Sequence, residues 1–292
     1  MSDDPRVGGS PTDESAAGGT GGPAQPPPSV YAPWAGGPVT ERAHCVLAPN
    51  PGPMTLDGTN TWVLREPGST AAVVIDPGPA DEAHLARILD VVATAGARVA
   101  LTVLTHAHLD HSEGAPRFAE LTGAPVRAVG QGHDDLGDGD VLTTGGLELR
   151  VVSTPGHTAD SVSFALPGDH SLLTGDTVLG RGTTVVAHPD GELAAYLDSL
   201  ERIRRLTGDG DVVTILPGHG PAVPDAAAMV EFYRRHRWER LQEVRSALAD
   251  GASAEADPVE GVLRRVYADV APTVWPAARM SIRAQLDYLG AR

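Results

Sequence analysis

The stretch Thr105-His106-Ala107-His108-Leu109-Asp110-His111 places three histidines and an aspartate within six positions, directly after the apolar run Val99 to Leu104. A short apolar run of this kind predicts a buried strand. Imidazole and carboxylate groups are ligands that zinc accepts, and a turn at a strand end lets alternate side chains converge on one point. The stretch therefore predicts a metal site at the end of a strand, with a loop of solvated histidines as the alternative interpretation.

Three further residues stand in similar places along the chain: His157, Asp176 and His219. Each lies at a turn beside an apolar strand and has a glycine directly before it. Glycine there permits an unusual turn and a close approach of the backbone to a ligand. Singly, each residue is more typical of a surface loop, but their joint occurrence in this order favours metal ligation.

The length and composition indicate one sizeable globular domain, with or without a small appendage: 292 residues, 41% hydrophobic and 21% charged. The apolar runs end well before the roughly 18 residues that a membrane span needs. The acidic start, Met1 to Pro5, has no hydrophobic segment behind it and does not resemble a secretory signal. A single cysteine, Cys45, agrees with a reducing compartment. We expect a cytoplasmic protein without membrane contact.

The charge disfavours a polyanionic partner. The formal net charge is 22 − 38 = −16, and all the basic residues are arginine. Residues 39–224 hold 24 acidic and 11 basic residues, 11 − 24 = −13, whereas residues 225–292 hold ten of each. Nucleic acid is bound chiefly by lysine and arginine that neutralise phosphates, so we expect a small-molecule partner, with RNA as a possible alternative.

The chain divides into three parts that differ in composition and in their apolar patterns. Residues 1–38 contain eight glycines and eight prolines, which predicts a disordered tail. Residues 39–224 alternate strand and helix patterns, which predicts sheets covered by helices: strands at 61–64, 71–75, 99–104, 126–128, 147–152, 162–166, 171–173 and 212–216, and helices at 81–95 and 193–206. Residues 225–292 show only helical patterns, over about 224–249, 258–268 and 277–289. The helical positions of Trp238 and Trp275 predict core or inter-helix packing.

With these motifs, the chain resembles the metallo-β-lactamase fold superfamily over about residues 43–290. The segment Asn50 to Thr61 is similar to the β-lactamase-like protein 2 subgroup, whose animal member is an endoribonuclease. The resemblance implies an α/β (α+β) protein with an αββα sandwich. It also implies that the C-terminal helices are a partial winged-helix-like appendage, because no strand pattern for the wing follows the last helix.

The resemblance further implies a dinuclear zinc site, and all seven positions of the family pattern match. His106, His108 and His157 would bind one ion, Asp110, His111 and His219 the second, and Asp176 would bridge them. Two ions so placed lower the pKa of a bridging water, and the resulting hydroxide attacks a carbonyl or phosphoryl centre. Asp110 is the expected catalytic proton shuttle.

At several positions the chain differs from particular branches of the superfamily, and these differences disfavour some activities. Zinc β-lactamases carry cysteine or a non-ligand where Asp176 stands, whereas glyoxalase II enzymes, nucleases and many thioesterases carry the aspartate. Flavodiiron proteins have glutamate at the position of His108, and acyl-homoserine lactonases have tyrosine at the position of Leu179. Lactamase, iron redox and lactonase activities are therefore disfavoured.

Three hypotheses remain. The first is a hydrolase of small thioesters or esters, favoured by the acidic body. The second is a metal-dependent endoribonuclease acting on single-stranded RNA, favoured by the subgroup resemblance. The third is a metal-binding protein without turnover. Arg234, Arg235, Arg237 and Arg240 could face phosphates, but Glu231, Glu239 and Glu243 lie among them at helical spacing, which predicts a salt-bridged surface.

Overall fold

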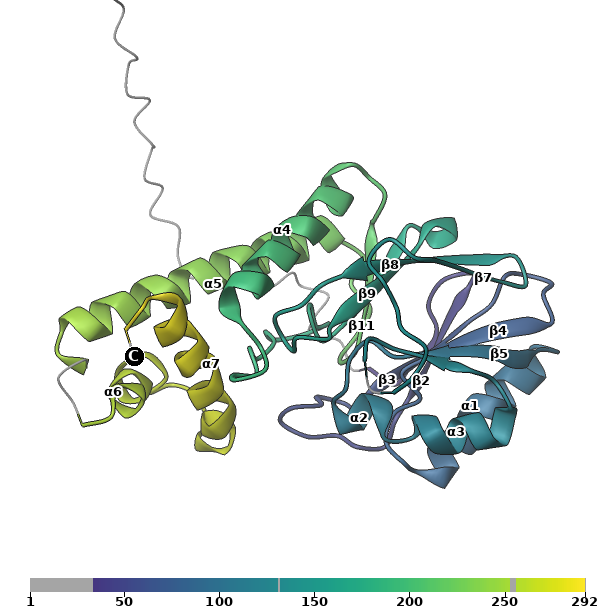
Figure 1. The fold of residues 1–292 in the computed structure, drawn as a ribbon, viewed down its shortest axis with the longest axis horizontal. Coiled ribbons are helices and arrows are strands. Elements are labelled where there is room, and N and C mark those ends of the chain that lie inside the picture. The colour runs from purple at the N-terminus through teal and green to yellow at the C-terminus, as the bar shows by residue number, and fades with distance from the viewer. Residues whose placement is uncertain (1–33, 131, 253–255, 292) are drawn as a thin grey trace, which may run out of the picture.

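The computed structural model describes residues 34–130, 132–252 and 256–291, and these residues build two facing β-sheets (Figure 1). The first sheet has the spatial order β1 (Gly37–Pro38), β2 (Ala43–Leu47), β3 (Asn60–Leu64), β4 (Ala71–Ile75), β5 (Arg98–Val103) and β6 (Val126–Arg127). The second has the order β11 (Thr214–Pro217), β10 (Ser171–Gly175), β9 (Val162–Leu166), β8 (Leu147–Ser153) and β7 (Val141–Thr144). Pairing is parallel for β4 with β5, β5 with β6 and β10 with β11, and antiparallel elsewhere.

Helices cover the outer face of each sheet. Helices α1 (Glu82–Thr94) and α3 (Ala115–Thr122) pack on the first sheet, and α4 (Leu193–Gly208) and α5 (Ala226–Ala249) pack on the second. A short helix, α2 (Leu109–Ser112), follows β5. The four layers form an αββα sandwich, which confirms the fold class predicted from the sequence.

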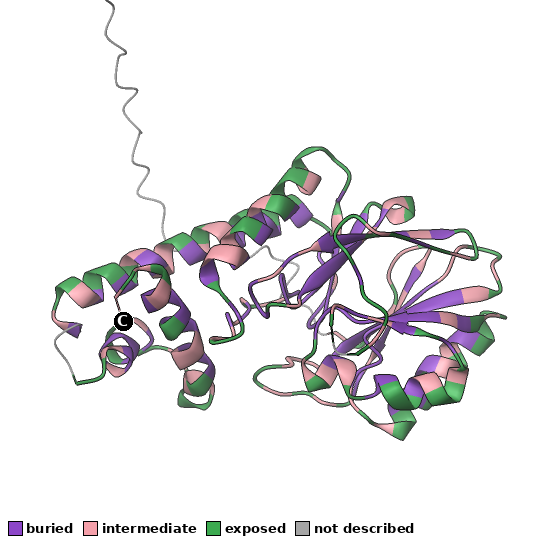
Figure 2. Ribbon diagram, viewed as in Figure 1, coloured by how far each residue is buried: buried purple, intermediate pink, exposed green. Residues whose placement is uncertain are grey.

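Most residues of the central strands are buried, because both faces of these strands are covered (Figure 2). In β10, Leu173 points between the two sheets while its neighbour Leu172 points toward α4 and α5. Leu216 and Ile215 of β11 divide in the same way. The alternation of side chains along a strand thus supplies both the central core and the outer one.

The C-terminal helices continue the second outer layer and then leave it. The first half of α5 shares a core with β11, through contacts of Met229 and Tyr233 with the cluster that contains Ile215. Its second half packs with α6 (Pro258–Val266) and α7 (Trp275–Tyr288) in a separate apolar cluster. The predicted C-terminal helices are confirmed. No strand follows Pro217 within the described residues, while the likeness to a winged helix and the boundary at 224 remain predictions.

Two expectations need correction. Residues 1–33 of the expected tail lie outside the described residues, but residues 34–38 are structured: the Trp34 indole donates to Asn60 Oδ1 at 2.7 Å, and β1 pairs with β2. An aromatic side chain buries much apolar area, which offsets the cost of ordering this short segment. Trp238, whose helical position suggests packing, is 63% exposed on α5.

Within the described ranges, no helix combines the length and the apolar composition needed to cross a membrane.

We expect Met229→Ala to destabilise the protein, because Met229 is fully buried between α5 and the second sheet. Truncation of a buried methionine costs about 2–5 kcal/mol. Thermal melts of the variant and of the control Met54→Ala, at a position 48% exposed, test this. Equal melting temperatures for Met229→Ala and the parent would contradict packing of α5 on the sandwich.

Candidate metal centre

The seven candidate ligands lie at one end of the sandwich, each just beyond the end of a strand. His106 and His108 follow β5. Asp110 and His111 come next and lie in the short helix α2. The remaining three candidates follow β8, β10 and β11 in turn: His157, Asp176 and His219. Strand ends that share one edge of a sandwich bring residues far apart in sequence to a single place.

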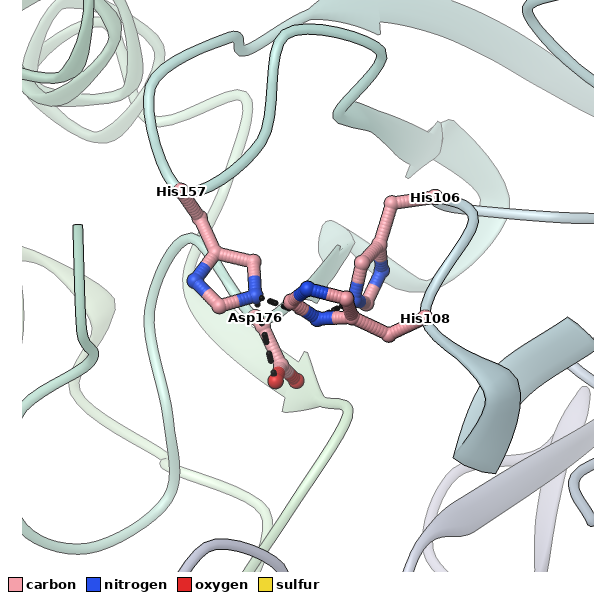
Figure 3. Close-up of side chains that lie close together, drawn as sticks. All are labelled: His106, His108, His157 and Asp176. Atoms are coloured by element: carbon pink, nitrogen blue, oxygen red, sulfur yellow. Dashed lines mark hydrogen bonds and ion pairs between the residues drawn. The ribbon is translucent and has the colours of Figure 1, made fainter. Parts of the chain in front are cut away.

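The first group contains His106, His108, His157 and Asp176, whose ligand atoms lie within 4.8 Å of one another (Figure 3). The Nδ1 atom of His108 is 3.1 Å from Nε2 of His106 and 3.0 Å from Nε2 of His157. The carboxylate of Asp176 approaches His157 Nε2 at 3.7 Å. Three ring nitrogens and one carboxylate oxygen therefore converge on one point.

The second group contains Asp110, His111 and His219. The two Nε2 atoms are 3.3 Å apart, and Asp110 Oδ2 lies 3.4 Å from that of His111 and 3.2 Å from that of His219. Asp176 reaches this group as well, with Oδ2 at 3.3 Å from His219 Nε2. Asp176 thus lies close to both groups, and its role as a bridge, which the family resemblance implies, stays a prediction.

The residues present fit divalent cations such as zinc. Asp176 Oδ1 is buried and accepts no hydrogen bond from any described residue, a costly state for a carboxylate unless a cation meets it. Imidazole nitrogens and carboxylate oxygens are the donors that zinc prefers. Each of the two groups offers at least three of them, so the chain has donors for two ions.

The rear ring nitrogens of four histidines are hydrogen-bonded, which orients the opposite nitrogens toward the centre. The acceptors are Thr105 Oγ1 for His106, Asp76 Oδ2 for His111, the Val185 carbonyl for His157 and the Gly58 carbonyl for His219, at 3.0, 2.8, 2.6 and 3.2 Å. Such bonds fix the tautomer and make a ligating histidine more basic.

The two groups differ in protonation. Burial lowers the pKa of His157 to about 4 and that of His106 well below its ordinary value, with nearby imidazoles acting in the same direction. Burial also opposes charge on His219, but Asp176 and Asp110 outweigh it and raise its pKa to about 10. The His219 hydrogen bond and the His111 charge hold the pKa of Asp110 at about 2 despite burial. His106 and His157 are therefore neutral and ready to ligate, whereas His219 holds a proton that a cation would displace.

Sequence reasoning missed Asp76, a buried residue at the end of β4. Its Oδ2 accepts from His111 Nδ1 at 2.8 Å and from Thr105 Oγ1 at 2.7 Å, and its Oδ1 accepts from the Thr105 amide at 2.8 Å. Asp76 thereby positions Thr105 and His111, the first and last residues of the stretch 105–111. Its place directly after the apolar run 71–75, like that of the other site residues, was the available signal.

The segment Asn50 to Thr61 forms hydrogen bonds around the second group. Thr59 Oγ1 donates to Asp110 Oδ2 at 3.0 Å and accepts from the Asn50 amide group at 3.0 Å. Asn60 Nδ2 donates to the carbonyls of Pro217 and Gly220, on either side of His219, at 2.9 and 2.8 Å. This segment therefore fixes both a carboxylate and a histidine of the site.

Two glycines next to candidate ligands allow the close approach that the sequence suggests. A Cβ atom on Gly218 would lie 2.4 Å from Asp176 Oδ1, and one on Gly156 would lie 2.3 Å from Tyr196 Cα, with Gly156 at φ +133°. Any larger residue would push His219 or His157 away from the centre.

Helices α4 and α5 hold the loop that follows Asp176. The Tyr196 hydroxyl donates to the Thr177 carbonyl at 2.7 Å, and the Tyr233 hydroxyl accepts from the Leu179 amide at 2.8 Å. Arg237 Nη2 donates to the Thr184 carbonyl, and its guanidinium lies 4.8 Å from the Tyr196 ring centre. The helices that close the outer core thus also position the backbone around His157.

Comparison with known proteins agrees with this geometry. The sequence model of the Metallo-beta-lactamase superfamily matches residues 54–138 and 130–219 of this chain. An atrochrysone carboxyl ACP thioesterase of Aspergillus fumigatus is 36% identical over 254 residues, which span 80% of this chain and 77% of that one. A beta-lactamase-like protein 2 homolog of Caenorhabditis elegans is 31% identical over 263 residues, 86% of this chain and 85% of that one.

Solved structures share the fold. A beta-lactamase domain protein from Burkholderia ambifaria superposes with a TM-score of 0.72 over 88% of this chain and 90% of its own, at 23% identity. A metallo-beta-lactamase family protein from Thermus thermophilus gives a TM-score of 0.68 over 85% and 93%, at 22% identity. The coverage extends beyond residue 219, where the superfamily match ends.

Asp176→Ala should lower bound metal after zinc-supplemented expression from about two ions per chain to one or fewer, because both donor groups lose a shared oxygen. Metal analysis of folded protein, checked by circular dichroism, measures this. Two ions retained by Asp176→Ala would show that Asp176 is not the bridge.

Asp76→Asn should weaken zinc binding about 10–100-fold. An amide offers one oxygen only, so its NH₂ group must face either the Thr105 amide or the His111 proton. Competition with a chromophoric chelator gives the affinity, and Asp198→Asn, at an exposed position on α4, is the matched control. Equal affinity in the two variants would exclude the positioning role.

Proposed function

The chain belongs to the metallo-beta-lactamase superfamily and is a hydrolase, and on this premise we propose that it cleaves small thioesters or esters with two zinc ions. The observation that carries the proposal is the convergence of seven donor side chains in two adjacent groups joined by Asp176. A thioesterase name among relatives at 36% identity supports the thioester class.

The division of labour follows from the donor groups. His106, His108 and His157 would hold one ion and Asp110, His111 and His219 the other, with Asp176 shared. Zinc in such a site makes water a nucleophile near neutral pH and polarises the carbonyl oxygen of the substrate. No serine or cysteine nucleophile is then required, which agrees with Cys45 being buried in the core between the sheets.

Asp110 is suited to move protons between the reacting groups and solvent. Its side chain is 29% exposed, against 10% for Asp176 and 0% for His111. Thr59 donates to its Oδ2 and fixes the carboxylate plane. We assign Asp110 the proton transfer to the departing thiolate or alkoxide, because it is the most accessible carboxylate of the two groups.

The surface charges favour a small acyl substrate over RNA. Arg234 pairs with Glu231 at 2.8 Å and Glu201 at 3.6 Å, and Arg240 pairs with Glu243 at 2.8 Å. These pairs bear out the predicted salt-bridged face of α5. An arginine already paired with a carboxylate neutralises a phosphate less well, and the −13 charge of residues 39–224 repels a polyanion.

Turnover of the zinc-loaded protein should distinguish the hypotheses. We expect hydrolysis of acyl thioesters whose kcat/KM changes little with salt or in the double variant Arg234→Glu/Arg235→Glu. RNA cleavage would instead fall steeply with ionic strength, with binding losing about 0.7 log units per log unit of salt for each contacted phosphate. Salt-sensitive RNA cleavage that the double variant abolishes would overturn the proposal, and no turnover with either substrate class would indicate a non-catalytic metal protein.

A further inference from the structure

A groove of about 420 Å³ opens from the candidate metal centre toward the C-terminal helices. His157 and Asp176 line its inner end, and residues of α5 and α7 line the rest together with the loops at 53–56 and 179–185. Pockets of this size bind small organic ligands in other proteins. A substrate with its reacting bond at the centre can extend into this space.

Part of the groove lining away from the centre is apolar. Two parts of the chain supply this apolar lining: the loops with Met54, Leu56 and Leu179, and the start of α7 with Val274 and Ala277. Met54 is 48% exposed, although methionine is usually buried. A flexible thioether at the mouth of a groove adapts to apolar ligands of irregular shape.

The arginines of the groove bond the protein, although Nε of Arg237 has no hydrogen-bond partner among the described residues. Arg181 bonds Asp57 at 2.6 Å, and Arg240 bonds Glu243 and the Val266 carbonyl, each at 2.8 Å. Arg237 is buried under the Thr184 carbonyl. The paired arginines Arg181 and Arg240 are therefore less available to a phosphate chain, and the apolar side chains remain for a hydrocarbon.

His236 adds no charge to the groove. Its Nε2 lies 3.4 Å from Thr183 Oγ1 and its ring stacks on Phe232. Burial, with Arg237 and Arg240 nearby, lowers its pKa to about 3, so it is neutral at physiological pH.

Resting on the thioesterase function proposed above, we propose that this groove binds the apolar acyl chain of the substrate, and that Ala277 and Val274 set the chain length it accepts. The carbonyl carbon lies at the metal centre and the hydrocarbon runs between loop 53–56 and α7. Hydrolysis adds water across the C–S bond: the acyl carbon gains oxygen and the thiol leaves with a proton.

The test is a series of straight-chain acyl N-acetylcysteamine thioesters, from acetyl to dodecanoyl, with zinc-loaded protein. Each methylene bound in the groove should raise kcat/KM by up to about fourfold until the groove is full. Ala277→Leu should lower the decanoyl-to-acetyl ratio of kcat/KM about tenfold or more. Val274→Ala should move the longest accepted chain upward. A flat chain-length profile would overturn the groove assignment while leaving the thioesterase function in place.

The control is Ala268→Leu, the same substitution at an exposed position that precedes α7 and does not line the groove. It should keep the parent's chain-length profile. An equal change in Ala268→Leu and Ala277→Leu would show a general effect of disturbing the C-terminal helices, and would contradict the assignment.

A binding measurement separates failure of the groove from failure of the function. S-alkyl N-acetylcysteamine thioethers cannot be hydrolysed, and calorimetry should show affinity rising with chain length and a negative heat-capacity change. If no thioester is cleaved but these thioethers bind in this way, the groove assignment stands and the proposed reaction falls. Displacement of the decyl thioether by single-stranded RNA would instead assign the groove to nucleic acid.

Discussion

The carboxylate of Asp176 is the constraint on which the site depends. It is buried between two sets of histidines, with one oxygen that accepts no hydrogen bond from the described residues. A bare carboxylate in that position is costly, and the neighbouring imidazoles or bound cations have to offset its charge. This crowding is possible because Gly156 and Gly218 have no side chain and because several strands end around Asp176.

That crowding is tolerable because the sandwich beneath it is rigid. Both faces of β10 and β11 are buried, so Asp176 and His219 stand at the ends of strands that cannot tilt without disrupting two cores at once. Behind the ligands, Asp76 and the Asn50 to Thr61 segment supply acceptors and donors from the first sheet. The packing of the hydrophobic layers thus fixes the positions of the candidate ligands at the centre.

Local patterns, apolar strands followed by polar turns with glycine before His157, Asp176 and His219, predicted where strands end and which polar side chains follow them. The αββα arrangement was implied by the family resemblance. The structure brings the seven expected side chains together, and their ligation of metal stays a prediction. Sequence reasoning missed Asp76, since a single aspartate after a strand is common and only its contact with His111 distinguishes it. It also assigned Trp34 to the tail and Trp238 to a packed face, because a lone aromatic residue carries no information about what lies opposite it.

The groove was beyond sequence reasoning for a related reason: its walls come from loop 53–56, loop 179–185 and α7, which meet only in the folded chain. Its inner end is set by helices that also stabilise the protein, since Tyr196, Tyr233 and Arg237 hold the loop after Asp176 from the outer core. Its outer end is set by the start of α7, a helix that packs in the C-terminal cluster and reaches the outer core only further along, at Ala284. Changes at the start of α7 can therefore alter the shape of the groove with little effect on the donor groups, whereas changes in the first half of α5 would disturb stability, metal binding and substrate fit together.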